Sequence, residues 1–123
     1  MSAMIIPERT WGDTAYPLTW QAQDAESKVF FRWESGKIRI RTLQNVVVVD
    51  NVDVDVTGAN VTNDDKLSWP PVYGSGANQI PEVDIKKSSV IYLVQFTGIV
   101  LGAPDGKNVQ KSVERSWRIL RAI

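Results

Sequence analysis

The chain has 123 residues, 43% of them hydrophobic and 23% charged, and its fourteen basic residues balance its fourteen acidic ones. This length and composition predict one globular domain, spanning residues 1–123, and exclude an intrinsically disordered chain. A chain without net charge has no electrostatic attraction for nucleic acid or for an anionic membrane, so we expect neither as a partner.

Cysteine and histidine are both missing from the sequence, and their absence narrows the chemistry open to the chain. Neither a Ser-His-Asp or Cys-His nucleophile nor the usual kind of zinc site can be built. The glycines of residues 74–76 lack the flanking residues of a phosphate-binding loop. The N-terminal segment has no basic start and no apolar core, so we expect no signal peptide and synthesis in the cytoplasm. We therefore expect neither an enzyme nor a cofactor.

The first half of the chain alternates between apolar and polar residues, after an N-terminal arm (about 1–15) that has no periodic pattern and is expected to be irregular. Alternation with period two predicts half-buried strands. The apolar faces of the first two predicted strands are Leu18, Trp20 and Ala22, and then Val29, Phe31 and Trp33.

Two later segments alternate with charges of opposite sign. Residues 37–42 alternate basic residues with isoleucine, and residues 50–56 alternate aspartate with valine. If the two strands pair, Arg39 and Arg41 are expected near Asp53 and Asp55. Each such cross-strand pair contributes roughly 0.2–1 kcal/mol, which favours the register more than the overall stability.

A stretch of about residues 57–79 interrupts the strand pattern and predicts a long loop, which in a compact domain is often functional. It contains Trp69-Pro70-Pro71-Val72-Tyr73, where the prolines favour an extended backbone. Exposed tryptophan and tyrosine side chains anchor protein interfaces and stack on sugar rings. Trp69, Tyr73 and Trp11 of the arm are therefore the candidate contact residues. The alternative for Trp69, a side chain folded back over the core, stays open.

The C-terminal third predicts a long β-hairpin. Residues 88–101 are rich in β-branched and aromatic residues, and Pro104-Asp105-Gly106 is a turn sequence. Residues 108–122 fit two patterns: a strand that pairs with the preceding one, or a helix that begins near Asn108. We expect the strand and keep a C-terminal helix as the alternative.

Aspartates are the only residues from which a metal site would be built, because oxygen ligands suit calcium. The candidates are Asp53 and Asp55 on the predicted strand and Asp64 and Asp65 in the loop. Alternate residues of a strand lie about 6.6 Å apart, and the closing glutamate of a calcium loop is missing. We therefore expect no metal site.

Together these patterns predict a single all-β domain, an antiparallel β-sandwich of the immunoglobulin-like or jelly-roll kind, with a small β-barrel as the alternative. The expected function is that of a non-catalytic structural or assembly protein, such as a capsid decoration, tail or baseplate component of a virion. We expect it to act through protein contacts, in a homo-oligomer or a larger assembly. The alternative is a carbohydrate-binding module that uses its loop aromatics.

Overall fold

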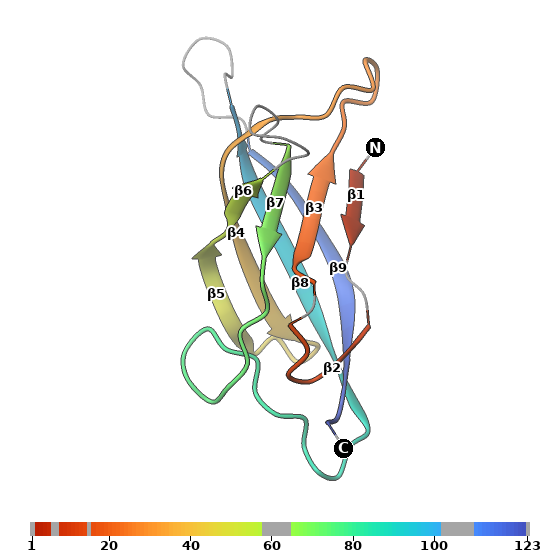
Figure 1. Ribbon diagram of the computed structural model, residues 1–123, viewed down its shortest axis with the longest axis vertical. Helices are drawn as coiled ribbons and strands as arrows, with labels where there is room; N and C mark the ends of the chain where they lie inside the picture. Colours follow the sequence, from red (N-terminus) through yellow and green to blue (C-terminus); the bar gives the residue numbers. More distant parts are fainter. Residues whose placement is uncertain (1, 6–7, 15, 58–64, 102–109, 123) are drawn as a thin grey trace.

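The chain folds into two β-sheets that face each other across a shared hydrophobic core (Figure 1). The computed structural model describes residues 2–5, 8–14, 16–57, 65–101 and 110–122, and that part of the chain contains strands and no helix. The all-β prediction is confirmed. The barrel alternative is wrong, because the described strands form two separate sheets and neither closes on itself.

The first sheet has four strands, all paired antiparallel. The second has five strands and is mixed, because its short edge strand β2 runs parallel to β9 while the other pairs are antiparallel. In spatial order the first sheet consists of β1 (Ser2–Ile5), β3 (Leu18–Ala22), β7 (Lys66–Trp69) and β6 (Asp55–Thr57). The second consists of β2 (Arg9–Thr10), β9 (Gln110–Leu120), β8 (Ser89–Val100), β4 (Trp33–Thr42) and β5 (Val47–Asp53).

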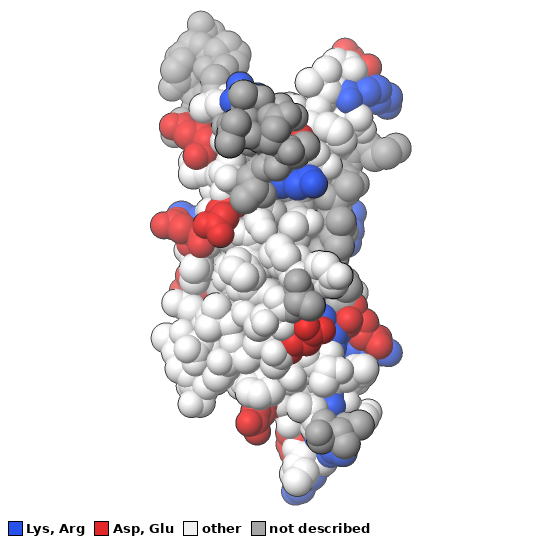
Figure 2. Space-filling view, viewed as in Figure 1, with Lys and Arg blue, Asp and Glu red and all other residues white. Residues whose placement is uncertain are grey.

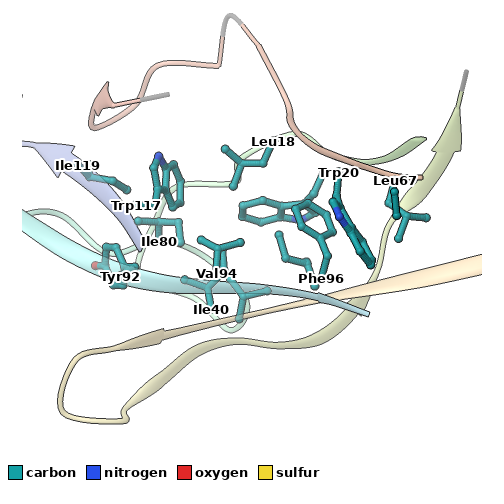
Figure 3. Close-up of a cluster of buried hydrophobic side chains, with 14 of the residues drawn as sticks. Leu18, Trp20, Ile40, Leu67, Ile80, Tyr92, Val94, Phe96, Trp117 and Ile119 are labelled. Carbon is teal, nitrogen blue, oxygen red and sulfur yellow. The ribbon is translucent and has the colours of Figure 1, made fainter. Parts of the chain in front are cut away.

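Tryptophans from both sheets fill the centre of the core. Trp20 of β3 and Trp33 of β4 lie with ring centroids 4.9 Å apart, and Phe96 of β8 packs on Trp20 at 6.4 Å. All three are at most 2% exposed. Trp117 of β9 is buried further along the same layer, as Figure 3 shows. The core role that strand alternation predicts for Trp20, Trp33 and Trp117 is confirmed.

The C-terminal segment is a strand, so the predicted hairpin is confirmed and the alternative of a helix is wrong. β8 and β9 pair antiparallel from Ser89↔Leu120 to Ile99↔Gln110. Trp117 and Ile119 are buried while Arg118 between them is exposed, which is the period of two that a strand requires. The predicted turn, residues 104–106, lies outside the described residues.

Two segments that were expected to be irregular contain strands. The arm (1–15) holds β1 and β2, and the long loop (57–79) holds β7. These strands are only two to four residues long, too short for a visible alternation, and they exist because a neighbour pairs with them. β7, for example, pairs with β3 from Leu18↔Trp69 to Trp20↔Leu67.

The predicted strand at residues 28–34 is only partly formed. β4 begins at Trp33, and the chain before it is a tight turn in which Lys28 has a φ of 62° and Val29 is 64% exposed. The Asp24 carboxylate organises this turn by accepting the backbone N–H groups of Glu26 and Ser27, at 3.0 and 2.9 Å. Val29 is therefore not part of the face that Trp33 belongs to.

The basic and acidic strands do pair, as β4 and β5, but the ion pairs differ from those expected. Lys37 lies 3.0 Å from Asp53, Arg39 lies 3.9 Å from Asp50, and Arg41 lies 2.7 Å from Glu114 on β9. Asp55 belongs to the other sheet, on β6. The side chains of the Lys37–Asp53 and Arg39–Asp50 pairs are 37–87% exposed, so these two pairs contribute little to stability. The side chains of Arg41 and Glu114 are less exposed, at 24% and 40%.

Candidate functional site

Trp69 is a strand residue that is 5% exposed, in contrast to the expected loop contact. It lies opposite Leu18 in the sheet and belongs to the shared core. The sequence left two alternatives for Trp69, an exposed contact residue or a side chain folded over the core. The structure shows the second. A buried indole offers no surface to a partner while the sheet is intact.

Tyr73 and Trp11 come together at the rim of the core, and we call this pair the aromatic clasp. Their rings meet edge to face, with centroids 5.4 Å apart and planes at 65°. The Trp11 indole N–H donates to the Ile80 carbonyl at 3.0 Å, and the Tyr73 hydroxyl donates to the Asp13 carbonyl at 2.7 Å. Both polar tips are therefore engaged within the chain, and the edge-to-face geometry leaves no flat platform of two rings for a sugar.

A buried arginine lies beside the clasp. Arg9 on β2 is 4% exposed, and its Nη1 donates to the same Asp13 carbonyl at 3.2 Å. Burial raises the pKa of the Tyr73 hydroxyl, while the positive charge of Arg9 acts in the opposite direction. The clasp thus ties the β2 segment to the segment that follows β7, which is a structural role.

The three described aspartates among the four metal candidates lie in separate surroundings. Asp53 is paired with Lys37, Asp55 is exposed on β6, and Asp65 accepts the Gln21 side-chain amide at 3.0 Å. Asp64 lies outside the described residues. Within the described residues, no group of three or more acidic, histidine or cysteine side chains could hold a metal ion.

The two edges of the five-stranded sheet differ in how they are covered. At the β5 edge, Asn78 reaches across and its Oδ1 accepts the Asp50 backbone N–H at 3.0 Å. At the other edge, β2 pairs only with Ile119 and Leu120 of β9. Next to them, Glu8 lies 3.9 Å from Arg118. No described residue pairs with the outer edge of β9 from Gln110 to Ser116, and we call this stretch the free edge.

Two hydrogen bonds near the end of β9 show which backbone groups of the free edge point away from β8. The Leu120 carbonyl accepts the Trp11 N–H on the β2 side, whereas the Arg121 N–H donates to Ser88 on the β8 side. Because successive residues of a strand direct their backbone groups to opposite sides, Ser112, Glu114 and Ser116 direct theirs outward. The Glu114 carbonyl accepts a hydrogen bond from the Arg115 side chain at 2.9 Å, and a strand that pairs there would replace or share this bond. The other outward N–H and C=O groups are a template for pairing with another strand.

The side chains of β9 also divide by face. Glu114 and Arg118 on the outer face each have an ion-pair partner, Arg41 and Glu8. Lys111 and Arg115 lie on the same face as the buried Trp117, are exposed, and have no carboxylate within ion-pair distance in the described part of the chain. Figure 2 shows a largely uncharged area over the middle of the visible face of the molecule. The free edge therefore carries two cations without a carboxylate in ion-pair distance, whereas that area carries few charges.

An open cavity of about 440 Å³ adjoins the inner face of the free edge. Its apolar lining includes Trp20, Phe31 and Val113, and the Lys111 ammonium lies 5.2 Å from the centre of the Phe31 ring. The Trp20 side chain borders the cavity, and its indole N–H is buried with no acceptor. The remaining lining residues are Ala22, Gln23, Asp24, Ala25, Lys111 and Ser112.

Sequence reasoning missed this surface, although one signal pointed to it. Arg115 interrupts an apolar face formed by Val113, Trp117 and Ile119. An inward-pointing charge is a typical feature of an edge strand. Which strand lies at the edge depends on the order of all nine strands, and the sequence does not reveal that order.

No protein-family model matches the chain, and neither a curated protein nor a solved structure shows significant similarity to it. Among the described residues, no helix has the length and apolar character needed to cross a membrane.

Proposed function

We propose that the protein is a non-catalytic structural or assembly protein that acts through protein–protein contacts. The observation that carries the proposal is the free edge, where no described residue pairs with the outer side of β9 from Gln110 to Ser116. An unpaired strand edge is a template for a strand from another chain, and proteins recognise extended segments in this way. The partner is a protein, either a second copy or another component of an assembly.

A small virion component, such as a capsid decoration, tail or baseplate protein, is the setting that we propose. The support is compositional: the chain is neutral and all-β, and it has neither the cysteine nor the histidine on which most catalytic and metal sites depend. Such a chain is suited to stable contacts rather than to chemistry.

We also propose that the two sheets form a β-sandwich of the immunoglobulin-like type. The order β1-β3-β7-β6 opposite β9-β8-β4-β5 supports this type, because immunoglobulin domains order their strands A-B-E-D opposite G-F-C, with C′ added in variable domains. β4 then corresponds to strand C, which carries a buried tryptophan in immunoglobulin domains, and Trp33 on β4 is 1% exposed. In place of the disulfide between strands B and F, Trp20 and Phe96 pack with ring centroids 6.4 Å apart.

The test uses the chain in the organism that makes it, tagged at its own locus and purified under native conditions. Ser116→Pro removes an outward N–H without removing a bond to β8, and Ser116→Thr is the matched control that keeps the N–H. We expect the wild type and Ser116→Thr to elute in a complex of fixed stoichiometry by size-exclusion chromatography with light scattering. Ser116→Pro should elute as a monomer with an unchanged circular dichroism spectrum.

Two outcomes would overturn the proposal. A wild-type chain that elutes as a monomer without stoichiometric protein partners would remove the assembly role. Specific binding on a glycan array by that monomer would favour a carbohydrate-binding module instead, with a site other than the aromatic clasp.

A further inference from the structure

The charges on the free edge disfavour pairing with a second copy of the same edge. If two free edges pair antiparallel about Val113, Lys111 of each copy lies opposite Arg115 of the other. If they pair about Glu114, the two Glu114 side chains lie opposite each other. These two registers use most of the free edge and keep the inner faces of both sheets on the same side. Both registers are disfavoured, because like charges directly opposite each other are destabilising. The partner strand is therefore expected to come from a different chain.

We propose that the free edge binds an extended segment of a partner protein in which an apolar residue alternates with two acidic ones. This inference rests on the proposed function and specifies its partner. The segment adds a strand to the five-stranded sheet outside β9. Its two carboxylates lie opposite Lys111 and Arg115, and its apolar side chain lies opposite Val113.

Backbone pairing supplies the first part of the recognition. Ser112, Glu114 and Ser116 direct their N–H and C=O groups outward, as the hydrogen bonds at Leu120 and Arg121 indicate. A partner strand that pairs with these residues satisfies backbone groups that otherwise face solvent. This part does not depend on the partner's sequence.

The cavity supplies the second part. The side chain opposite Val113 points to the inner face of the sheet, where Val113, Phe31 and Trp20 line the cavity of about 440 Å³. This volume lies in the range that holds a bulky side chain or a small ligand. An aromatic or large aliphatic residue at the centre of the segment is therefore favoured.

Charge complementarity supplies the third part. Lys111 and Arg115 flank Val113 on the inner face and have no carboxylate partner in the described part of the chain. Asp24 also lines the cavity, and the backbone N–H groups of Ser27 and Glu26 lower the pKa of its carboxyl. The Lys111 charge lowers this pKa further, but the two groups are not within ion-pair distance. Acidic residues two positions before and after the apolar residue match both cations, whichever direction the partner strand runs.

The experiment uses short capped peptides and the full chain labelled for NMR. The test peptide has the central sequence Glu-Thr-Phe-Thr-Glu, and the charge-reversed peptide has Lys-Thr-Phe-Thr-Lys. We expect the acidic peptide to shift the amide signals of Ser112, Glu114 and Ser116 and the indole signal of Trp20. The basic peptide should bind about tenfold more weakly, because two attractive cross-strand pairs become repulsive.

A double charge reversal on the protein provides the matched test. Lys111→Glu with Arg115→Glu should invert the preference, so that the basic peptide binds more tightly. Lys86→Glu with Lys87→Glu changes the net charge by the same amount on an exposed segment between Ile80 and β8, and should leave the preference unchanged.

Three results would overturn the inference: no binding of the acidic peptide, equal binding of both peptides, or signal changes that map elsewhere. Concentration-dependent dimerisation of the wild type through β9 would also overturn it in favour of a second copy. If the inference fails while Ser116→Pro still dissociates the native complex, the proposed function stands with a different partner chemistry. If the wild type is a monomer without partners, the proposed function itself fails.

Discussion

The molecule contains two aromatic pairs with similar ring distances that differ in burial and in hydrogen bonding. In the core, the ring centroids of Trp20 and Trp33 lie 4.9 Å apart, both side chains are almost completely buried, and only the Trp33 N–H donates to a backbone carbonyl, that of Asp65 at 3.2 Å. At the rim, the centroids of Trp11 and Tyr73 lie 5.4 Å apart, the side chains are half-buried, and both polar tips donate to backbone carbonyls. Burial of apolar area contributes most to the first pair, whereas hydrogen bonds position both members of the second. An aromatic side chain therefore reveals its role through its surroundings and not through its identity.

The largest effect is expected from Trp33→Ala in the core pair. Removal of a fully buried indole leaves a cavity between the two sheets and should lower the free energy of unfolding by about 3–5 kcal/mol. Denaturant melts monitored by circular dichroism measure the loss. Val29→Ala is the control, because Val29 was expected on the same strand face but is exposed. It should change the stability by no more than roughly 0.5 kcal/mol.

Overpacking the same pair should have the next largest effect. A Cβ at Gly98 would lie 2.5 Å from the Cε3 and Cζ3 atoms of Trp33, whose ring is fixed by its neighbours. Gly98→Ala should therefore destabilise the protein by about 1–3 kcal/mol. Gly12→Ala does not serve as a matched control, because Gly12 has a positive φ of 92°. A stability of Gly98→Ala equal to that of the wild type would mean that the ring moves freely, against the close packing described above.

Substitutions in the aromatic clasp should lower the free energy of unfolding through lost hydrogen bonds rather than through lost buried apolar area. Trp11→Phe removes the N–H that donates to Ile80, and Tyr73→Phe removes the hydroxyl that donates to Asp13. Each change should cost about 0.5–1.5 kcal/mol. A double-mutant cycle with the same melts measures the coupling between the two hydrogen bonds, because both substitutions keep an aromatic ring. Additive effects would show that the two hydrogen bonds act independently of each other.

The smallest expected effect is a dependence on alkaline pH. Burial raises the pKa of Tyr73 and of Tyr92 above the ordinary value of 10.0. The unfolded chain therefore loses these protons first, and stability should be constant below about pH 10 and fall as the pH rises beyond it. Urea melts at several pH values across that range measure the slope. Tyr73→Phe should make the fall shallower, and an unchanged slope would mean that Tyr73 ionises as easily in the folded protein.

The longest elements could be predicted from the sequence alone. Leu18, Trp20 and Ala22 alternate with polar residues, and all three are buried on one face of β3. The dense run of β-branched and aromatic residues at 89–100 forms β8, and the alternation of Trp117 and Ile119 with Arg118 distinguishes β9 from a helix. Local alternation was sufficient because β3 and β8 bury one face over most of their length, and β9 buries one face at Trp117 and Ile119.

The short strands could not be predicted in this way. β7 has four residues, and its identity as a strand depends on pairing with β6 and with β3, of which β3 lies far from it in the sequence. Trp69 therefore looked like a loop residue beside two prolines, and it became a core residue only through its neighbour Leu18. The same holds for β1 and β2 in the arm, whose partners are β3 and β9.

The sequence by itself determined that this is an all-β chain without cysteine or histidine, and it fixed the faces of the long strands through their alternation. Only the tertiary structure decided which strand lies at the edge of the five-stranded sheet, and so which backbone groups stay unpaired. Arg115 and Lys111 have the same positive charges wherever β9 lies in the sheet. They become two cations beside a cavity because strand order leaves the outer side of β9 without a described strand from Gln110 to Ser116. Strand order is a property of long-range pairing that no local pattern records.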